Sequence, residues 1–154
     1  MNESITENIV RSQFTNYGYY TDTSLVIDEQ KSSISQIDKL LQTASKKDSG
    51  TGYPEFIIKS KNINDFVYIV ECKTDITKHQ SKNLDKYSDY AVDGAKLYSD
   101  YLSKEFDVLF IGVSGQNKKE LKVSHYFQLK GEKEIQSAFD NQMLDFNSDV
   151  EKYK

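Results

Sequence analysis

Two glutamates and a lysine stand inside the most apolar segments of this sequence. Glu55 directly precedes the apolar residues 56–58, and Glu71 and Lys73 close the segment that begins with the apolar residues 67–70. Ionised side chains are costly to bury unless they are paired or bind a metal. These three residues therefore need either a partner or a function.

Two carboxylates beside a lysine are suited to metal-assisted hydrolysis of a phosphodiester. Carboxylate oxygens are preferred ligands of Mg²⁺, for which Mn²⁺ can substitute. The metal draws charge from the phosphate and lowers the pKa of a bound water, while the lysine can orient that water or stabilise the developing negative charge. The alternative is a structural Glu–Lys pair on an exposed sheet face, because surface ion pairs are common.

A β-hairpin must bring these residues together. Residues 55–60 and 66–73 read as strands, and the polar residues between them read as a turn. If Ser60 faces Asp65, Glu55 lies opposite Val70 and Pro54 opposite Glu71, with an error of about one residue. Neighbouring strands lie roughly 4.8 Å apart, so one cation could contact both carboxylates.

Period-2 alternation separates the side chains at the end of the second strand. It places Glu71 and Lys73 on one face of the sheet and Cys72 on the other. Cys72 and His79 could suggest a thiol nucleophile, but a cysteine that points into the core is more often structural. His125 alternates with apolar neighbours on a later strand and is also expected to be structural.

The other elements predict an α/β fold with a mixed central sheet flanked by helices. Residues 24–28 are too short a segment to assign. Helix 84–103 must cross over between the strands on either side of it, which makes the sheet mixed. The expected helices span residues 4–17, 33–44, 84–103 and 132–139, and the remaining strands span 106–113 and 122–129.

Length, charge and composition limit the possible functions. The 154 residues fit one domain, and the net charge of −4 argues against a protein that finds nucleic acid by bulk electrostatics. No run of eighteen apolar residues occurs, the N-terminus is polar, and the single cysteine cannot form an internal disulfide. We expect a cytoplasmic protein without a membrane partner, to which any DNA has to be delivered.

Four ordered blocks of the sequence resemble the PD-(D/E)XK nuclease superfamily, in particular the N-terminal nuclease domains of type I and type IIG restriction-modification enzymes. The blocks are residues 52–58, residues 69–75 with His79 soon after, residues 90–98 and residues 106–115. The resemblance covers about residues 5–130 and implies a restriction-endonuclease-like fold.

The resemblance also implies roles for single residues. Glu55 takes the position of the metal-binding Asp, with one more methylene, Glu71 that of the second ligand, and Lys73 that of the lysine that assists catalysis. The backbone carbonyl of Cys72 would be a further ligand of Mg²⁺ or Mn²⁺. Glu7 resembles an additional acidic residue near the metal, and its alternative role is a carboxylate favoured by the helix dipole.

The third block departs from the family pattern at one position. Gly94 stands where many relatives carry the Gln of a Gln-x-x-x-Tyr motif, although Tyr98 occupies the matching place. The candidates for DNA contact are Tyr98, Lys78, His79 and Lys82, and for the lysines solvated surface is the alternative.

The expected function is that of a metal-dependent endodeoxyribonuclease domain of a restriction-modification enzyme, acting on double-stranded DNA. Residues 1–140 form the nuclease domain, and residues 141–154 form a polar tail or linker to further domains. Methyltransferase, specificity or helicase domains or subunits would supply sequence recognition and DNA affinity. The alternative is a non-catalytic scaffold or docking module with the same fold.

Overall fold

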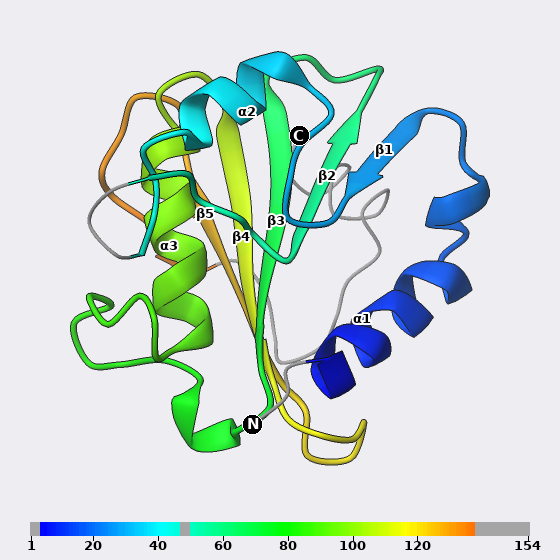
Figure 1. Ribbon diagram of the computed structural model, residues 1–154, viewed down its shortest axis with the longest axis vertical. Coiled ribbons are helices and arrows are strands. Elements are labelled where there is room, and N and C mark those ends of the chain that lie inside the picture. The colour runs from blue at the N-terminus through cyan, green and yellow to red at the C-terminus, as the bar shows by residue number, and fades with distance from the viewer. Residues whose placement is uncertain (1–3, 47–49, 138–154) are drawn as a thin grey trace.

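The computed structural model describes residues 4–46 and 50–137, which form a six-stranded sheet flanked by helices (Figure 1). The strands lie in the order β1-β2-β3-β4-β5-β6, and β3 and β4 are parallel while the other neighbours are antiparallel. The expected α/β class and mixed sheet are confirmed. The strands are β1 Leu25–Asp28, β2 Phe56–Ser60, β3 Phe66–Lys73, β4 Asp107–Ser114, β5 Lys122–Gln128 and β6 Gln136–Ser137. The helices are α1 Ser4–Asn16, α2 Ser35–Leu41 and α3 Ala91–Leu102, with short 3₁₀ helices η1 Tyr19–Thr21 and η2 Ile76–Lys78.

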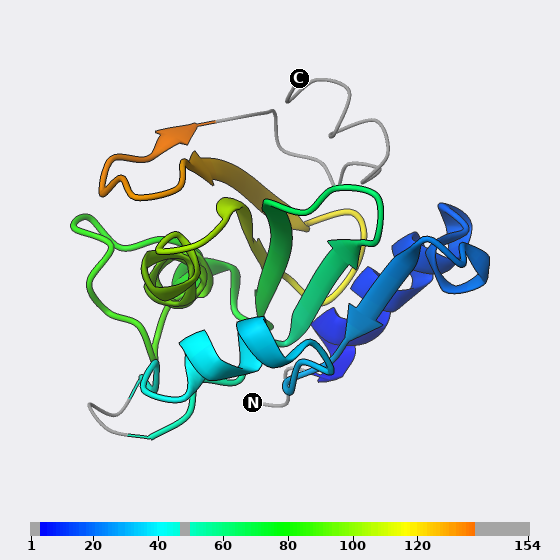
Figure 2. The ribbon, with the colours of Figure 1, turned by 90° about the horizontal axis from the view of Figure 1, so that it is seen from above.

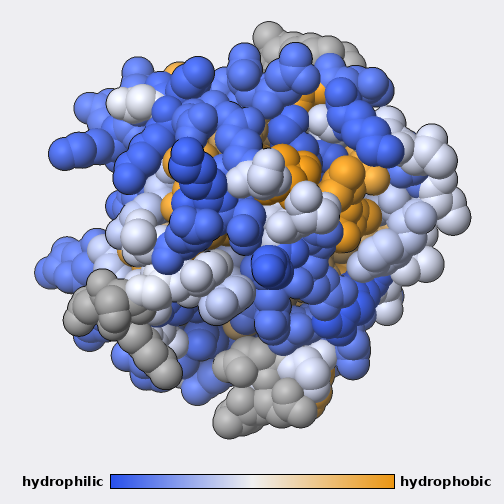
Figure 3. Space-filling view, turned by 45° about the horizontal axis from the view of Figure 1, so that its top comes forward, coloured by the Kyte–Doolittle hydropathy of each residue, from blue (hydrophilic) through white to orange (hydrophobic). Residues whose placement is uncertain are grey.

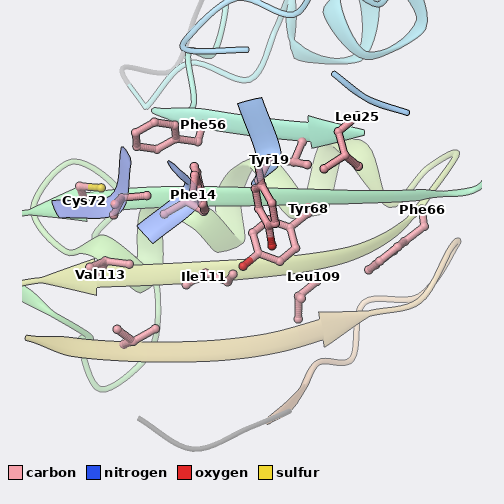
Figure 4. Close-up of a cluster of buried hydrophobic side chains, with 14 residues drawn as sticks. Phe14, Tyr19, Leu25, Phe56, Phe66, Tyr68, Cys72, Leu109, Ile111 and Val113 are labelled. Carbon is pink, nitrogen blue, oxygen red and sulfur yellow. The ribbon is translucent and has the colours of Figure 1, made fainter. Parts of the chain in front are cut away.

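The helices cover both faces of the sheet, α1 on one face and α2 with α3 on the other (Figures 1 and 2). On the first face, Val10 and Phe14 of α1 pack on the sheet residues drawn in Figure 4. On the second face, α2 contributes Ile37 and Leu41, and α3 packs along β3 and β4. These two apolar layers fix the orientation of every side chain on the central strands.

Strand β3 alternates between these two layers. Phe66, Tyr68, Val70 and Cys72 belong to the layer under α1, whereas Val67 and Ile69 belong to the layer under α2 and α3. Cys72 is fully buried in the first layer, as expected for a structural cysteine (Figure 4). By the same alternation, Glu71 faces α3.

The hairpin of β2 and β3 has a register one residue away from the predicted one. Phe56, and not Glu55, lies opposite Val70, because the connection takes the five residues 61–65 instead of four. Continuing the observed count by one residue brings Glu55 opposite Glu71. Residues directly opposite each other share a face of the sheet, so the shift places both carboxylates on the side of α3.

Helix α3 begins seven residues later than predicted, at Ala91 instead of residue 84. Leu84 has a positive φ of 56°, and the segment before the helix is a loop that bonds to the buried carboxylate of Asp93. The apolar pattern of residues 84–90 reflects a loop packed on the core, since Leu84 contacts the layer under α3.

Two other predictions at the sheet edges differ from the structure. Residues 132–137 form no helix: Gln136 pairs with Phe127 and extends the sheet as β6, while the rest of that predicted helix lies outside the described residues. At the opposite edge, residues 25–28 form β1, although the segment was too short to assign from the sequence. In both places the pairing partner decides the structure.

The surface and the termini add two observations. Figure 3 shows a face on which hydrophilic residues predominate and hydrophobic residues gather in one central area. Within the described ranges, none of the helices combines the length and apolar character needed to cross a bilayer. The predicted tail 141–154 lies outside the described residues.

Candidate active site

Glu55 and Glu71 form a carboxylate pair at the end of the β2–β3 hairpin. The backbone N–H of Glu55 donates to Oε1 of Glu71 at 2.9 Å, and Glu71 is only 1% exposed. Glu55 is partly buried and its carboxyl group bonds to that of Glu71. The structure therefore brings together the two glutamates that the sequence singled out.

Burial and mutual repulsion govern the protonation of this pair. Burial, followed by the negative charge of Glu71 and the hydrogen bond between the carboxyl groups, raises the pKa of Glu55 well above its usual range. Two carboxylates this close disfavour double ionisation unless a cation lies beside them. The pair is thus a place where a cation would be stabilised.

The backbone of Cys72 also faces the pair. Its N–H donates to Oε2 of Glu55 at 3.3 Å. This contact lies just outside the β2–β3 pairing, which begins at Phe56, the first residue of β2. The N–H and C=O of one strand residue point to the same side of the strand, so the Cys72 carbonyl is directed toward Glu55 as well. The Cys72 thiol points the other way, and burial raises its pKa, so it is not a nucleophile.

This donor set fits a hard divalent cation, because it consists of oxygens from two carboxylates and a carbonyl group. Within residues 4–46 and 50–137, no group of three or more His, Cys, Asp and Glu side chains is arranged to hold a metal. A metal bound by Glu55, Glu71 and the Cys72 carbonyl would therefore complete its shell with water and substrate oxygens.

Lys46 is the lysine that bonds to the pair. Its Nζ lies 2.6 Å from Oε2 of Glu71, and its side chain is 19% exposed. Burial lowers the pKa of Lys46, but the charge of Glu71, the neighbouring Tyr98 and the hydrogen bond to Glu71 together outweigh burial, so that the pKa lies above its ordinary value. The ammonium group is therefore a resident positive charge at the pair.

Two glycines and a tyrosine shape the space around this ion pair. A Cβ on Gly94 would lie 3.0 Å from Cε and Nζ of Lys46, and a Cβ on Gly52 would lie 2.7 Å from the ring of Tyr98. Nζ of Lys46 lies 5.5 Å from the centre of the Tyr98 ring. The missing side chain at Gly94 thus leaves the room through which Lys46 reaches Glu71.

Lys73 and Glu7 each have a partner outside the carboxylate pair. Nζ of Lys73 donates to the backbone carbonyl of Ser88 at 2.8 Å, in the loop before α3. Glu7 accepts from Arg11, one turn later in α1, at 3.3 Å. Glu7 nevertheless contributes to the raised pKa of Cys72, so its charge acts on the end of β3.

The four candidates for DNA contact differ in exposure. Lys78 and Lys82 are exposed, and Nζ of Lys78 lies 5.2 Å from the centre of the Tyr90 ring. His79 is partly buried, and its two ring nitrogens lie 2.8 Å from the hydroxyl groups of Ser114 and Ser124. Burial lowers the pKa of His79 to about 4, so it is neutral at pH 7.

Tyr98, the fourth candidate, is 4% exposed and packs beside the carboxylate pair. Burial, followed by the charge of Glu71, raises its pKa to about 12. In this conformation the two lysines are the candidates whose charged groups a phosphate can reach directly.

Lys46 is the residue of this site that the sequence did not reveal. Lys46 lies in a polar segment that reads as an ordinary loop, and no spacing links it to Glu71, which is 25 positions away. Gly94 was the feature of the sequence that could have pointed to such a residue. A glycine in a helix that faces a charged site leaves space for a side chain from another element.

The comparisons with known proteins give one partial match. The chain is 36% identical over 111 residues to the type II restriction enzyme and methyltransferase RM.BcgI of Heyndrickxia coagulans. The match covers 63% of this chain and 17% of that protein. No family model and no solved structure matches the chain.

Proposed function

We propose that this chain is the DNA-cleaving domain of a restriction-modification enzyme, a metal-dependent endonuclease of the PD-(D/E)XK type. The observation that carries the proposal is the carboxylate pair of Glu71, which is buried on β3, and Glu55, which directly precedes β2 and accepts the N–H of Cys72. The similarity to part of a restriction enzyme and methyltransferase supports the same biological setting.

Each residue of the site has a chemical role in the proposal. Glu55, Glu71 and the Cys72 carbonyl would hold Mg²⁺, which when bound lowers the pKa of a water and neutralises charge on the phosphate. Lys73 follows Glu71 by two residues on the same face of β3. Turned away from the Ser88 carbonyl, its ammonium group can orient the attacking water or stabilise the developing negative charge.

DNA binding needs help from outside this chain. The net charge of −4 gives little general attraction for a polyanion, although the segment between β3 and α3 presents the exposed Lys78, Lys82 and Lys86. In the proposal these lysines position the DNA backbone, while methyltransferase, specificity or helicase domains supply affinity and sequence recognition.

A fusion protein tests the proposal without a known recognition sequence. The chain is joined to a zinc-finger array, and supercoiled plasmid with the array's site is incubated with Mg²⁺ or Mn²⁺. We expect nicks or double-strand breaks near that site, and none from the matched Glu71→Gln fusion. Site occupancy is measured by footprinting, and a fusion that occupies its site without cutting, or equal cutting by Glu71→Gln, would refute the proposal.

A second candidate function is a non-catalytic docking module, and one contact favours it. Lys46 already neutralises Glu71, so the carboxylate has a partner without a metal. The docking reading predicts that Mn²⁺ leaves the melting temperature unchanged, whereas the nuclease reading predicts stabilisation that depends on Glu71.

A further inference from the structure

The ion pair of Lys46 and Glu71 uses the oxygen that a metal would need. Oε1 of Glu71 already accepts the backbone N–H of Glu55 at 2.9 Å. Oε2 accepts no backbone N–H from the described residues and is therefore the more open oxygen for a ligand, and Nζ of Lys46 lies 2.6 Å from it. An ammonium group and a divalent cation repel each other, so both cannot lie against this one oxygen without a cost.

We infer that, in the metal-free protein, the ammonium group of Lys46 occupies the position beside Glu71 at which a divalent metal binds. The metal binds there as the ammonium group moves away. The inference rests on the proposed function, because it concerns the same metal site. It adds a residue and a regulatory step that the family pattern of two acidic residues and one lysine does not contain.

The surroundings of Lys46 favour an ammonium group that a metal can displace over one that is fixed permanently at Glu71. Its side chain is partly exposed, whereas that of Glu71 is almost completely buried, so the lysine is the partner that can turn out to water. Lys46 lies outside any helix or strand, while Glu71 is fixed in β3. A lysine also has a flexible four-carbon stem, and the end of this one lies beside Gly94 of α3 and 5.5 Å from the centre of the Tyr98 ring.

As a consequence, the wild-type protein should bind a divalent metal more weakly than the same oxygen ligands would without the charge of Lys46. Removal of the Lys46 charge frees Oε2 of Glu71 and removes the repulsion of the incoming ion. Isothermal titration with Mn²⁺ on Lys46→Met should therefore give a Kd about tenfold lower than on the wild type. Lys82→Met, which removes an exposed lysine of the loop before α3, should leave the Kd unchanged.

A second experiment uses the wild-type chain alone, so that it does not depend on the folding of a variant. Surface lysines are acetylated briefly with a soluble reagent, and the extent at each lysine is measured by mass spectrometry with and without Mn²⁺. We expect Lys46 to be protected without metal and to react several-fold faster at saturating Mn²⁺. Lys82 in the same sample is the internal control and should not change.

The outcomes separate this inference from the proposed function. If Mn²⁺ binds the wild type but Lys46→Met gains no affinity, or if Lys46 stays protected at saturating Mn²⁺, the exchange is refuted while the metal site stands. If Mn²⁺ binds neither protein, the metal site and the exchange are both refuted.

Discussion

Replacing Glu71 by alanine should destabilise the metal-free chain strongly. The change removes the partner of the Lys46 ammonium group and the acceptor of the Glu55 N–H, at a residue that is 1% exposed. Breaking a buried ion pair on one side costs about 3–5 kcal/mol, because the remaining charge is left without compensation. The Lys46 side chain is 19% exposed and can turn toward water, which offsets part of this cost, so we expect a net loss of about 2–4 kcal/mol.

The assay is urea unfolding at 25 °C and pH 7 in the presence of EDTA, followed by circular dichroism. Glu134→Ala is the matched control, because Glu134 is exposed, and its free energy of unfolding should change by less than about 0.5 kcal/mol. The double variant Lys46→Met/Glu71→Ala should recover about 1–3 kcal/mol relative to the sum of the single changes.

Two results would contradict this reasoning. A loss below about 1 kcal/mol for Glu71→Ala would mean that the carboxylate behaves as a solvated surface group. Strict additivity of the two single variants would mean that Lys46 and Glu71 do not interact in solution.

Three further predictions concern other parts of the chain. Lys73→Ala should change the free energy of unfolding by less than about 1 kcal/mol, because the hydrogen bond from its Nζ to the Ser88 carbonyl lies at an exposed position. The same change should lower cleavage by the zinc-finger fusion about 100-fold or more, and cleavage at the wild-type rate would show that Lys73 takes no part in the reaction. Asp93→Ala should lower the free energy of unfolding by about 2–4 kcal/mol and speed hydrogen exchange in residues 81–90, because the buried carboxylate accepts the N–H groups of Ser81 and Lys86 at 3.0 Å. Unchanged exchange would show that the loop keeps its structure without these two hydrogen bonds. Burial lowers the pKa of His125 to about 4, below the unfolded value of 6.5, so the unfolded state binds the extra proton and the free energy of unfolding should fall as pH drops from 6.5 toward 4. Urea unfolding at several pH values should show that this free energy depends less steeply on pH in His125→Leu than in the wild type. Equal slopes in the two proteins would count against a neutral buried histidine.

The central strands and the mixed sheet were predictable from the sequence, because apolar runs rich in β-branched residues have few alternatives to a buried sheet. Strand β3 was predicted with both of its ends correct, at Phe66 and Lys73. The crossover through α3 followed from the length of chain between β3 and β4.

Other elements depended on tertiary contacts that no local pattern reports. Residues 84–90 carry apolar side chains at helical spacing, but the carboxylate of Asp93 binds their backbone into a loop. The hairpin register depended on one additional turn residue, and that single position decides whether Glu55 shares a face with Glu71.

The candidate site was predictable in its strand residues and not in its loop residues. Glu71 and Cys72 lie on β3 and Glu55 directly precedes β2, so their positions follow from the strand pattern of the sequence. The position of Lys46 and the bond from Lys73 to Ser88 depend on how two loops fold over the sheet, and loops of this length have no periodic signal.

A crystal of this chain soaked in millimolar Mn²⁺ would show whether the carboxylate pair binds a metal, because the anomalous signal of the metal locates it without any assumption about activity. We predict one peak within about 2.0–2.6 Å of a carboxylate oxygen of Glu55, an oxygen of Glu71 and the Cys72 carbonyl, with Nζ of Lys46 moved away from Glu71. An ordered structure without anomalous density at this pair, with Lys46 still bonded to Glu71, would contradict the account.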